Sequence, residues 1–318
     1  MRIVFMGTPD FAVPCLEALA GSGYDIAAVV TQPDKPVGRK QSVLKAPAVK
    51  EAAIRLGIAN ILQPEKIRTS EFVDAISAIA PDVIVTAAYG KILPKSVLDI
   101  PKHGCINVHA SLLPKYRGAA PIQWALINGD SKTGVTTILM DEGMDTGDIL
   151  LMKEIGIPSD MNAQELFDCL RILGAEVLLE TLEALRDGTL TRKPQDHSKA
   201  VYVPMMTRET GLIDWKKSAV EIHNLVRGTN PWPGAYTFYR GKRLKIWKTT
   251  VCQENDGFLP NSGVDTVKPG MLLKCLKDGL IVATGSGLLS ITELQFDNCR
   301  RMCVIECGHN MDVGEVFG

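Results

Sequence analysis

The 318-residue sequence predicts an α/β domain with a mostly parallel sheet, followed by a small antiparallel β-barrel domain. Three observations support this prediction. Over residues 1–188, short apolar runs alternate with helix-length amphipathic segments, which is typical of chains in which strands and helices alternate. Residues 189–206 lose this periodicity and are polar, as expected of a linker. Residues 207–318 then contain several short strand-like segments separated by glycine-containing turns.

The first strand is expected at Ile3–Met6, and Gly7-Thr8-Pro9-Asp10 after it forms a turn that leads into a helix. This turn lacks the Gly-x-Gly-x-x-Gly fingerprint, so we predict a Rossmann-like domain that does not use a nicotinamide cofactor. Further strands are expected at 26–31, 61–63, 82–87, 105–108, 136–140 and 149–157, and helices at 48–56, 70–79, 121–128 and 163–187.

Residues 104–121 contain the strongest functional signal in the chain. Side chains alternate between the two faces of a strand, so Asn107 and His109 point one way while Ile106 and Val108 point the other. Ligands of open α/β sheets bind at the carboxyl ends of the strands. An amide there can donate to an oxyanion, and an imidazole can exchange a proton near neutral pH. The alternative is a capped strand end with both side chains bonded to the backbone.

An acidic, glycine-containing turn follows the strand expected at 136–140. Its sequence is Asp141-Glu142-Gly143-Met144-Asp145-Thr146-Gly147-Asp148, which does not fit the pattern of a calcium loop. One interpretation is a solvated polar turn. The other is a turn that delivers a carboxylate beside His109.

Four motifs occur in order: Asn107-Val-His109, Ser111-Leu-Leu-Pro114, Arg117-Gly-Ala-Ala-Pro121 and Met140-Asp-Glu-Gly-Met-Asp-Thr-Gly-Asp148. Together they resemble the folate-dependent formyltransferases. The resemblance implies that residues 1–188 form a formyltransferase catalytic domain with Asn107, His109 and Asp145 as the catalytic trio. It also implies a folate site formed by Ser111, Leu112, Leu113, Pro114, Tyr89, Gly90, Ile92, Leu93 and Asp141. For Tyr89 and Ile92, ordinary core packing is the alternative.

The resemblance implies transfer of the formyl group of 10-formyltetrahydrofolate to the α-amino group of methionyl initiator tRNA. Attack of an amine on a formamide carbon creates a tetrahedral oxyanion, so the step needs an oxyanion donor, a proton acceptor and a proton for the departing nitrogen. We expect Asn107 and His109 to hold the oxyanion and Asp145 to assist proton transfer. No metal is required.

The segment 32–50 is long for a connection between a strand and a helix, and it is basic and rich in proline and glycine. It is either a solvated excursion or an arm that meets phosphate. Family members that act on methionyl-tRNA insert a basic loop at this position, which implies tRNA contacts by Lys35, Arg39, Lys40 and Lys45. Residues 191–318 carry 17 basic and 13 acidic side chains. The net positive charge of this part of the chain agrees with a polyanionic partner.

In the C-terminal part, residues 235–238 and 244–248 are predicted to form a hairpin. Arg243, Lys245 and Trp247 share one face of its second strand, and Leu244 and Ile246 share the other. The strands of residues 207–318 suggest an oligonucleotide-binding (OB-like) barrel. The family carries such a domain here, which implies tRNA contacts by Arg243, Lys245 and Lys248.

Eight scattered cysteines and the absence of a signal pattern or an apolar run of about 20 residues predict a cytoplasmic protein without membrane contact. We also expect a monomer. Cys299, Cys303, Cys307 and His309 have the composition of a metal site. If residues 299–307 were helical, however, the outer thiols would lie about 12 Å apart, too far to share one tetrahedral ion. We therefore expect these cysteines to occupy apolar positions on a terminal helix.

Three other functions remain open. A serine hydrolase could use Ser111, His109 and Asp145, but the Gly-x-Ser-x-Gly elbow is missing and two residues of separation place Ser111 poorly for His109. A formyltransferase could act instead on a small amine acceptor, such as a purine ribotide or an amino sugar. A non-catalytic RNA-binding protein could retain a folate-like domain, against which the intact trio argues.

Overall fold

The computed structural model describes residues 1–37, 43–253 and 267–318. The chain divides into two compact units. Unit 1 comprises residues 1–121, 133–155 and 167–203, and unit 2 comprises residues 122–132, 156–166 and 204–318. The predicted limits of the catalytic domain, the linker and the C-terminal domain, at 188/189 and 206/207, stay a prediction. None of the helices in the described ranges is long and apolar enough to span a membrane.

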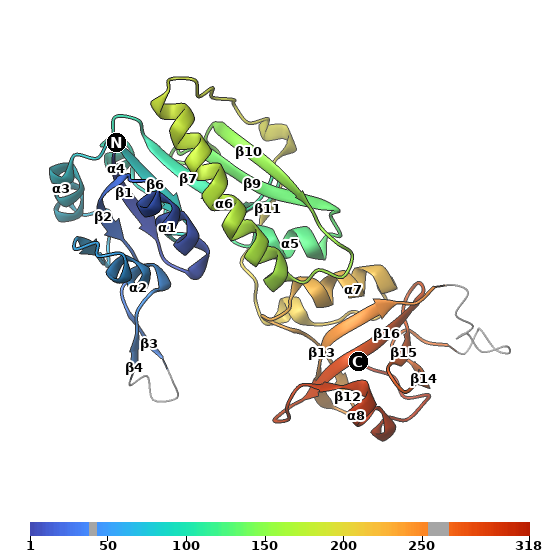
Figure 1. Cartoon of the computed structure of the whole chain (residues 1–318). Helices are drawn as coiled ribbons and strands as arrows, with labels where there is room; N and C mark the ends of the chain where they lie inside the picture. Colours follow the sequence, from blue (N-terminus) through green and yellow to red (C-terminus); the bar gives the residue numbers. More distant parts are fainter. Residues whose placement is uncertain (38–42, 254–266) are drawn as a thin grey trace. The chain divides into compact units, whose positions relative to one another are not determined.

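Unit 1 contains a seven-stranded sheet in the order β10-β9-β7-β6-β1-β2-β5 (Figure 1). Its strands are β1 (Arg2–Gly7), β2 (Asp25–Val30), β5 (Ile61–Leu62), β6 (Val83–Ala87), β7 (Cys105–His109), β9 (Lys132–Leu139) and β10 (Ile149–Gly156). The pairs from β5 to β7 are parallel, whereas β9 is antiparallel to β7. The predicted fold class, an α/β domain with a mostly parallel sheet, is confirmed.

The helices close to the predicted positions are α1 (Val13–Gly21), α2 (Ala48–Arg55), α3 (Ser70–Ile79), α5 (Pro121–Ile127) and α6 (Ala163–Arg186). A short helix that the sequence did not predict, α4 (Lys95–Leu98), lies between β6 and β7. Helix α3 begins after Thr69, whose hydroxyl accepts a hydrogen bond from the backbone N–H of Phe72. A core cluster joins α3 and α4 to one face of the sheet, including Cys105 of β7. The opposite face of β7 meets α6, where Gly174 lies against Val108.

The two faces of β7 therefore have different environments, as the alternation of its sequence predicts. Val108 faces the long helix α6, while Asn107 and His109 share the face of Cys105. Two short strands complete the surroundings: β8 (Arg117–Gly118) pairs in parallel with β11 (Tyr202–Val203). The polar segment after α6 thus contributes a strand to unit 1.

The predicted excursion at 32–50 contains a two-stranded hairpin, β3 (Lys35–Val37) and β4 (Val43–Lys45). The hairpin projects from the rest of unit 1 beside α2 (Figure 1). Lys35 pairs directly with Lys45 across it, and both side chains are exposed. Like charges on directly opposite residues destabilise a hairpin, so this pair costs the hairpin stability.

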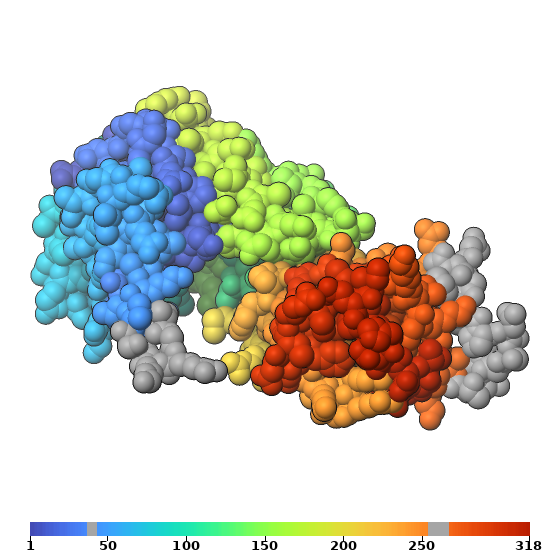
Figure 2. Space-filling view, turned by 60° about the horizontal axis from the view of Figure 1, so that its bottom comes forward, coloured from blue at the N-terminus to red at the C-terminus, as the bar shows by residue number. Residues whose placement is uncertain are grey.

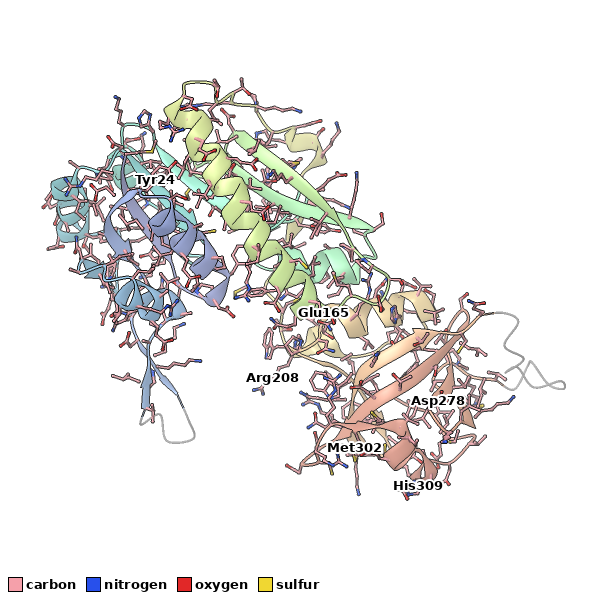
Figure 3. All side chains as sticks on the ribbon, in the orientation of Figure 1. Tyr24, Glu165, Arg208, Asp278, Met302 and His309 are labelled. Carbon is pink, nitrogen blue, oxygen red and sulfur yellow. The ribbon has the colours of Figure 1, made fainter. Side chains whose placement is uncertain are left out.

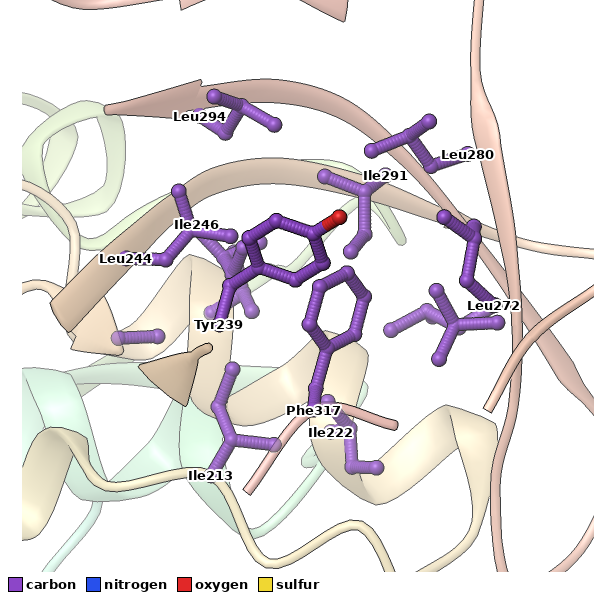
Figure 4. Close-up of a cluster of buried hydrophobic side chains, with 14 of the residues drawn as sticks. Ile213, Ile222, Tyr239, Leu244, Ile246, Leu272, Leu280, Ile291, Leu294 and Phe317 are labelled. Carbon is purple, nitrogen blue, oxygen red and sulfur yellow. The ribbon is translucent and has the colours of Figure 1, made fainter. Parts of the chain in front are cut away.

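Unit 2 contains an antiparallel sheet in the order β12-β13-β16-β15-β14, with β17 paired to β16. Its elements are α7 (Ala219–Gly228), β12 (Ala235–Tyr239), β13 (Lys242–Val251), β14 (Leu272–Cys275), β15 (Leu280–Ala283), β16 (Leu288–Phe296), β17 (Met302–Cys303) and α8 (Val304–Cys307). The inward side chains of these strands pack with α7 and Phe317 into one apolar core (Figure 4). This antiparallel domain agrees with the prediction and is compatible with an OB-like barrel.

The prediction for the cysteines near the C-terminus is wrong for Cys299 and Cys303 and is confirmed for Cys307, which is buried on α8. Only Val304–Cys307 form a helix, because Met302 and Cys303 pair with β16 instead. Cys299 and Cys303 are exposed, and Cys307 alone is buried. His309 lies at the edge of unit 2 (Figure 3), and atoms of the C-terminal segment, dark red in Figure 2, are visible on the surface of that unit, although Phe317 packs in its core. Within the described ranges, no group of three or more His, Cys, Asp or Glu side chains could hold a metal ion.

Candidate active site

The three residues that the sequence nominates for catalysis meet in unit 1. The Asp145 Oδ1 atom lies 3.6 Å from His109 Nδ1 and 3.4 Å from Asn107 Nδ2. The His109 and Asp145 side chains are 7% and 16% exposed, so water screens their interaction only partly. An amide, an imidazole and a carboxylate, separated by up to 38 residues, therefore surround one point on the sheet.

The Asn107 amide has a defined orientation because both of its ends have partners. The Asp145 carboxylate can only accept, so the amide nitrogen faces Asp145. The amide oxygen then faces the Thr86 hydroxyl, on neighbouring β6, which donates to Asn107 Oδ1 at 2.8 Å. One of its two N–H groups can point at Asp145, which leaves the other for a substrate oxygen. Thr86 was missed in the sequence, although it is the only polar side chain in the apolar strand Val83–Ala87.

We expect Thr86→Val to lower kcat about fivefold, because the lost hydrogen bond is worth about 1 kcal/mol and the Asn107 amide becomes free to turn. The control is Thr137→Val on β9 of the same sheet, which removes a buried hydroxyl that bonds to Thr181 of helix α6. Steady-state kinetics of both variants check this prediction. Equal kcat values for Thr86→Val and Thr137→Val would show that Thr86 does not orient the amide.

The tautomer of neutral His109 is set by the backbone. His109 Nε2 lies 2.9 Å from the carbonyl oxygen of Tyr116, which can only accept, so Nε2 carries the hydrogen. Nδ1 then presents a lone pair toward Asp145. Two hydrogen-bond acceptors, His109 Nδ1 and Asp145 Oδ1, thus lie 3.6 Å apart, and an N–H group between them could donate to either one. The free amine of a substrate can supply such a hydrogen, and so can a proton on Nδ1.

Asp145 is held in an unusual conformation. Its φ is +54°, in the left-handed region that Asp tolerates better than most residues. Its second carboxylate oxygen, Oδ2, accepts a hydrogen bond of 2.9 Å from the backbone N–H of Gly118. Gly147 approaches the sheet so closely that an added Cβ would lie 1.8 Å from the Leu139 carbonyl oxygen. The turn therefore packs directly on β9.

The residues predicted to bind folate occupy three segments with different environments. Ser111, Leu113, Tyr89 and Leu93 are buried, whereas Gly90, Ile92 and Asp141 are exposed and Leu112 and Pro114 are half-buried. The Ser111 hydroxyl donates to the Lys115 carbonyl at 2.6 Å and is thus committed within its own loop. The Asp141 carboxylate accepts from the Gly143 N–H and the Thr146 hydroxyl, at 3.0 and 2.6 Å, and stabilises the acidic turn.

Tyr89 packs in the core cluster with residues of α3 and α4, as the packing alternative expects. Burial raises the pKa of its phenol to about 12. Its hydroxyl therefore stays protonated, and within the described chain it has no hydrogen-bond partner. The Tyr89 carbonyl accepts hydrogen bonds from Thr8 and Gln32. The large apolar side chain that stays exposed on this loop is Ile92, at 47%, and the one on the acidic turn is Met144, at 48%.

The Ser111 hydroxyl is bonded to Lys115, and His109 Nε2 is bonded to Tyr116. Neither of these bonds joins the serine to the histidine as nucleophile and base. The serine hydrolase alternative therefore gains no support from the geometry.

A hollow of about 440 Å³ lies at the carboxyl ends of β1 and β2. Its lining includes Thr8, Asp10, Gln32, Glu51 and the paired lysines of the β3–β4 hairpin, Lys35 and Lys45. Of the other predicted tRNA contacts, Arg39 and Lys40 lie outside the described residues. In unit 2, Arg243 stacks on Tyr236 with its Cζ atom 4.5 Å from the ring centroid, Lys245 Nζ lies 5.1 Å from the Trp247 centroid, and Lys248 is exposed.

Comparisons with known proteins identify the family of the chain. The formyl transferase family profile matches residues 1–182, and the profile of the formyl transferase C-terminal domain matches residues 205–307. The chain is 57% identical to methionyl-tRNA formyltransferase of Acetivibrio thermocellus and 50% identical to that of Clostridioides difficile, over 100% of each chain. The chain belongs to the methionyl-tRNA formyltransferase family. It is therefore an enzyme of the formyltransferase class.

Solved structures share the fold of this formyltransferase at low sequence identity. One is the N-formyltransferase of Helicobacter canadensis, in complex with folinic acid and dTDP-3-aminofucose, with a TM-score of 0.67 and 18% identity over 92% of this chain and 98% of that one. Another is HypX of Aquifex aeolicus in complex with tetrahydrofolic acid, with a TM-score of 0.60 and 18% identity. The enzyme covers about half of that longer protein, since 96% of this chain matches 46% of HypX.

Proposed function

We propose that this enzyme transfers the formyl group of 10-formyltetrahydrofolate to the α-amino group of methionyl initiator tRNA in the cytoplasm. The observation that carries the proposal is the convergence of Asn107, His109 and Asp145 on one face of β7. The names of the full-length relatives supply the acceptor, and the folate-bound structures with the same fold support the donor.

The acceptor amine attacks the formyl carbon, and the carbonyl oxygen becomes an oxyanion. The Asn107 amide donates to this oxyanion through the N–H that does not face Asp145. Because Thr86 holds the amide oxygen, the donor is already oriented before the substrate arrives. A preorganised donor costs no reorganisation when charge develops, which is why such donors lower the barrier.

The attacking nitrogen must lose a proton, and N10 of the folate must gain one. The Nδ1 lone pair of His109 and the Oδ1 atom of Asp145 lie 3.6 Å apart and both face the point where the amine would sit. His109 Nδ1 accepts the amine proton, directly or by way of Asp145 Oδ1, and returns the same proton to N10 as the bond between carbon and N10 breaks. The products are the formylated amine and tetrahydrofolate, and the enzyme is unchanged.

Two half-exposed apolar side chains support a folate site beside the trio. Ile92 follows β6, Met144 follows β9, and these two strands flank β7 in the sheet. Met140, at the end of β9, packs against the same core cluster as Tyr89 and Leu93. Exposed apolar side chains of this kind suit a flat ring system such as a pterin.

The test is a formylation assay with 10-formyltetrahydrofolate and three acceptors. We expect formylation of methionyl initiator tRNA, much weaker transfer to methionyl elongator tRNA and none to a nucleotide-linked amino sugar. Uncharged initiator tRNA is the control, because it lacks the acceptor amine. Activity on the amino sugar alone would assign the enzyme to the class with small amine acceptors.

A further inference from the structure

Arg117 is the largest fully buried side chain of the enzyme, with 1% of its surface exposed. It lies on β8, one residue before the N–H that binds Asp145. Its guanidinium donates from Nε and Nη2 to Gln195 Oε1, at 3.2 and 2.7 Å, and from Nη1 to the Tyr202 hydroxyl at 3.0 Å. Burying a charged guanidinium costs free energy, which these hydrogen bonds offset in part. The burial of Arg117 at this position therefore calls for a functional explanation.

Gln195 receives a fixed orientation from this contact. Because arginine has no acceptor, the atom that faces it must be the amide oxygen. The amide nitrogen of Gln195 then points the other way and donates to two backbone carbonyls, those of Asp145 at 2.9 Å and Gly147 at 2.7 Å. Gln195 is 6% exposed, so water does not compete strongly for these hydrogen bonds.

These two carbonyls belong to the turn that aims the catalytic carboxylate. Asp145 has a φ of +54°, which side-chain-bearing residues seldom adopt without support. On the side of β9, Gly147 is packed against Leu139 without space for a side chain. The Gln195 amide binds the peptide groups of Asp145 and Gly147 themselves, so it constrains the direction of the Asp145 side chain.

We propose that Gln195, oriented by Arg117, is a positioning residue that holds the Asp145 turn so that its carboxylate stays beside His109 and Asn107. This inference rests on the catalytic role proposed above for Asp145. Its physical basis is that a shift of about 1 Å in a reacting group can cost about 10²-fold in rate.

The decisive variant is Gln195→Glu. A carboxylate at this position keeps an acceptor for Arg117 but loses the N–H donors to both carbonyls. We expect kcat to fall about 10²-fold, with the KM values for tRNA and folate and the melting temperature close to those of the wild type. If Gln195 served only to satisfy the buried guanidinium, kcat would stay at the wild-type value, and the proposal would be overturned.

A double-mutant cycle separates positioning from general damage to the fold. Asp145→Asn and Gln195→Leu are measured singly and together, with Thr181→Val as a control that removes a buried hydroxyl of unit 1 away from the turn. We expect each single change to lower kcat and the double variant to equal Asp145→Asn within about twofold. Thr181→Val should keep the wild-type kcat.

If the fall in kcat of the double variant equalled the product of the two single falls, Gln195 would act independently of the Asp145 carboxylate. That result would overturn the positioning role. Wild-type kcat for Asp145→Asn would instead refute the proposed function of Asp145, and the inference about Gln195 with it. The kcat of Asp145→Asn alone therefore distinguishes a failure of the proposed role of Asp145 from a failure of the proposed role of Gln195.

Discussion

Asn107→Ala is expected to lower kcat for formyl transfer by about 10²–10³-fold, which is the usual effect of removing one oxyanion donor. His109→Ala is expected to lower kcat by about 10²–10⁴-fold, the usual contribution of a general acid–base group, because it removes the lone pair that faces the acceptor amine and breaks the hydrogen bond to Tyr116. Asn107→Ala leaves the Thr86 hydroxyl without its acceptor at 2.8 Å. Single-turnover formylation of methionyl initiator tRNA measures both effects.

Binding and catalysis are separated by measuring folate affinity of the same variants. We expect the folate Kd to change little, because Asn107 acts on the carbonyl oxygen and His109 on the transferred proton, and neither role contributes to binding of the pterin. Matched controls are His103→Ala, just before the opposite end of β7, and Asn60→Ala, whose amide bonds to the Ala27 carbonyl at the surface. A fully folded His109→Ala variant with kcat within a few-fold of wild type would refute the mechanism.

Binding of tRNA is expected to weaken steeply with salt, whereas binding of folate should change little. Each lysine that neutralises a phosphate releases counterions; three such contacts lower affinity about 40-fold between 50 and 200 mM salt, and six to ten contacts lower it by about 10³-fold or more. The paired lysines of the β3–β4 hairpin and the exposed Lys248 of β13 are the described candidates. Fluorescence titrations over a salt series measure the slope.

Variants that each remove the charge of one lysine then identify which lysines contact tRNA phosphates. Lys35→Gln, Lys45→Gln and Lys248→Gln should each reduce the salt slope by about one and leave kcat at saturating tRNA unchanged. The control is Lys277→Gln, an exposed lysine between β14 and β15. A common slope for tRNA and folate, or equal effects of all four variants, would contradict the assignment.

The course of the chain around Asp145 illustrates the limit of reading strands from sequence. A strand at 136–140 and an acidic turn after it were predictable, but the direction of the strand was not. Strand β9 runs antiparallel to β7, with Leu139 opposite Ile106 and Thr136 opposite His109. Its end therefore lies beside the start of β7, and the 141–148 turn must fold back over the Asn107 face to reach His109. Strand direction depends on long-range pairing, which local periodicity does not encode.

Lys248 shows the same limit in unit 2. Simple alternation places it on the inward face with Leu244 and Ile246. The pairing of β13 with β16 shifts between Ile246 and Lys248, so Thr249 is buried and Lys248 is exposed. A bulge changes which side chains face outward, and it is set by the partner strand.

By itself, the sequence determined the α/β class, the order of the elements and the chemical groups of the site. These depend on local patterns: hydrophobic periodicity, turn residues and the motifs around Asn107, His109 and Asp145. Only the tertiary structure decided which way each group faces. Thr86 turns the amide, the Tyr116 carbonyl sets the imidazole tautomer, and Gln195 holds the acidic turn. Each of these is one hydrogen bond between atoms that the folded chain brings together, and no local pattern in the sequence specifies its geometry.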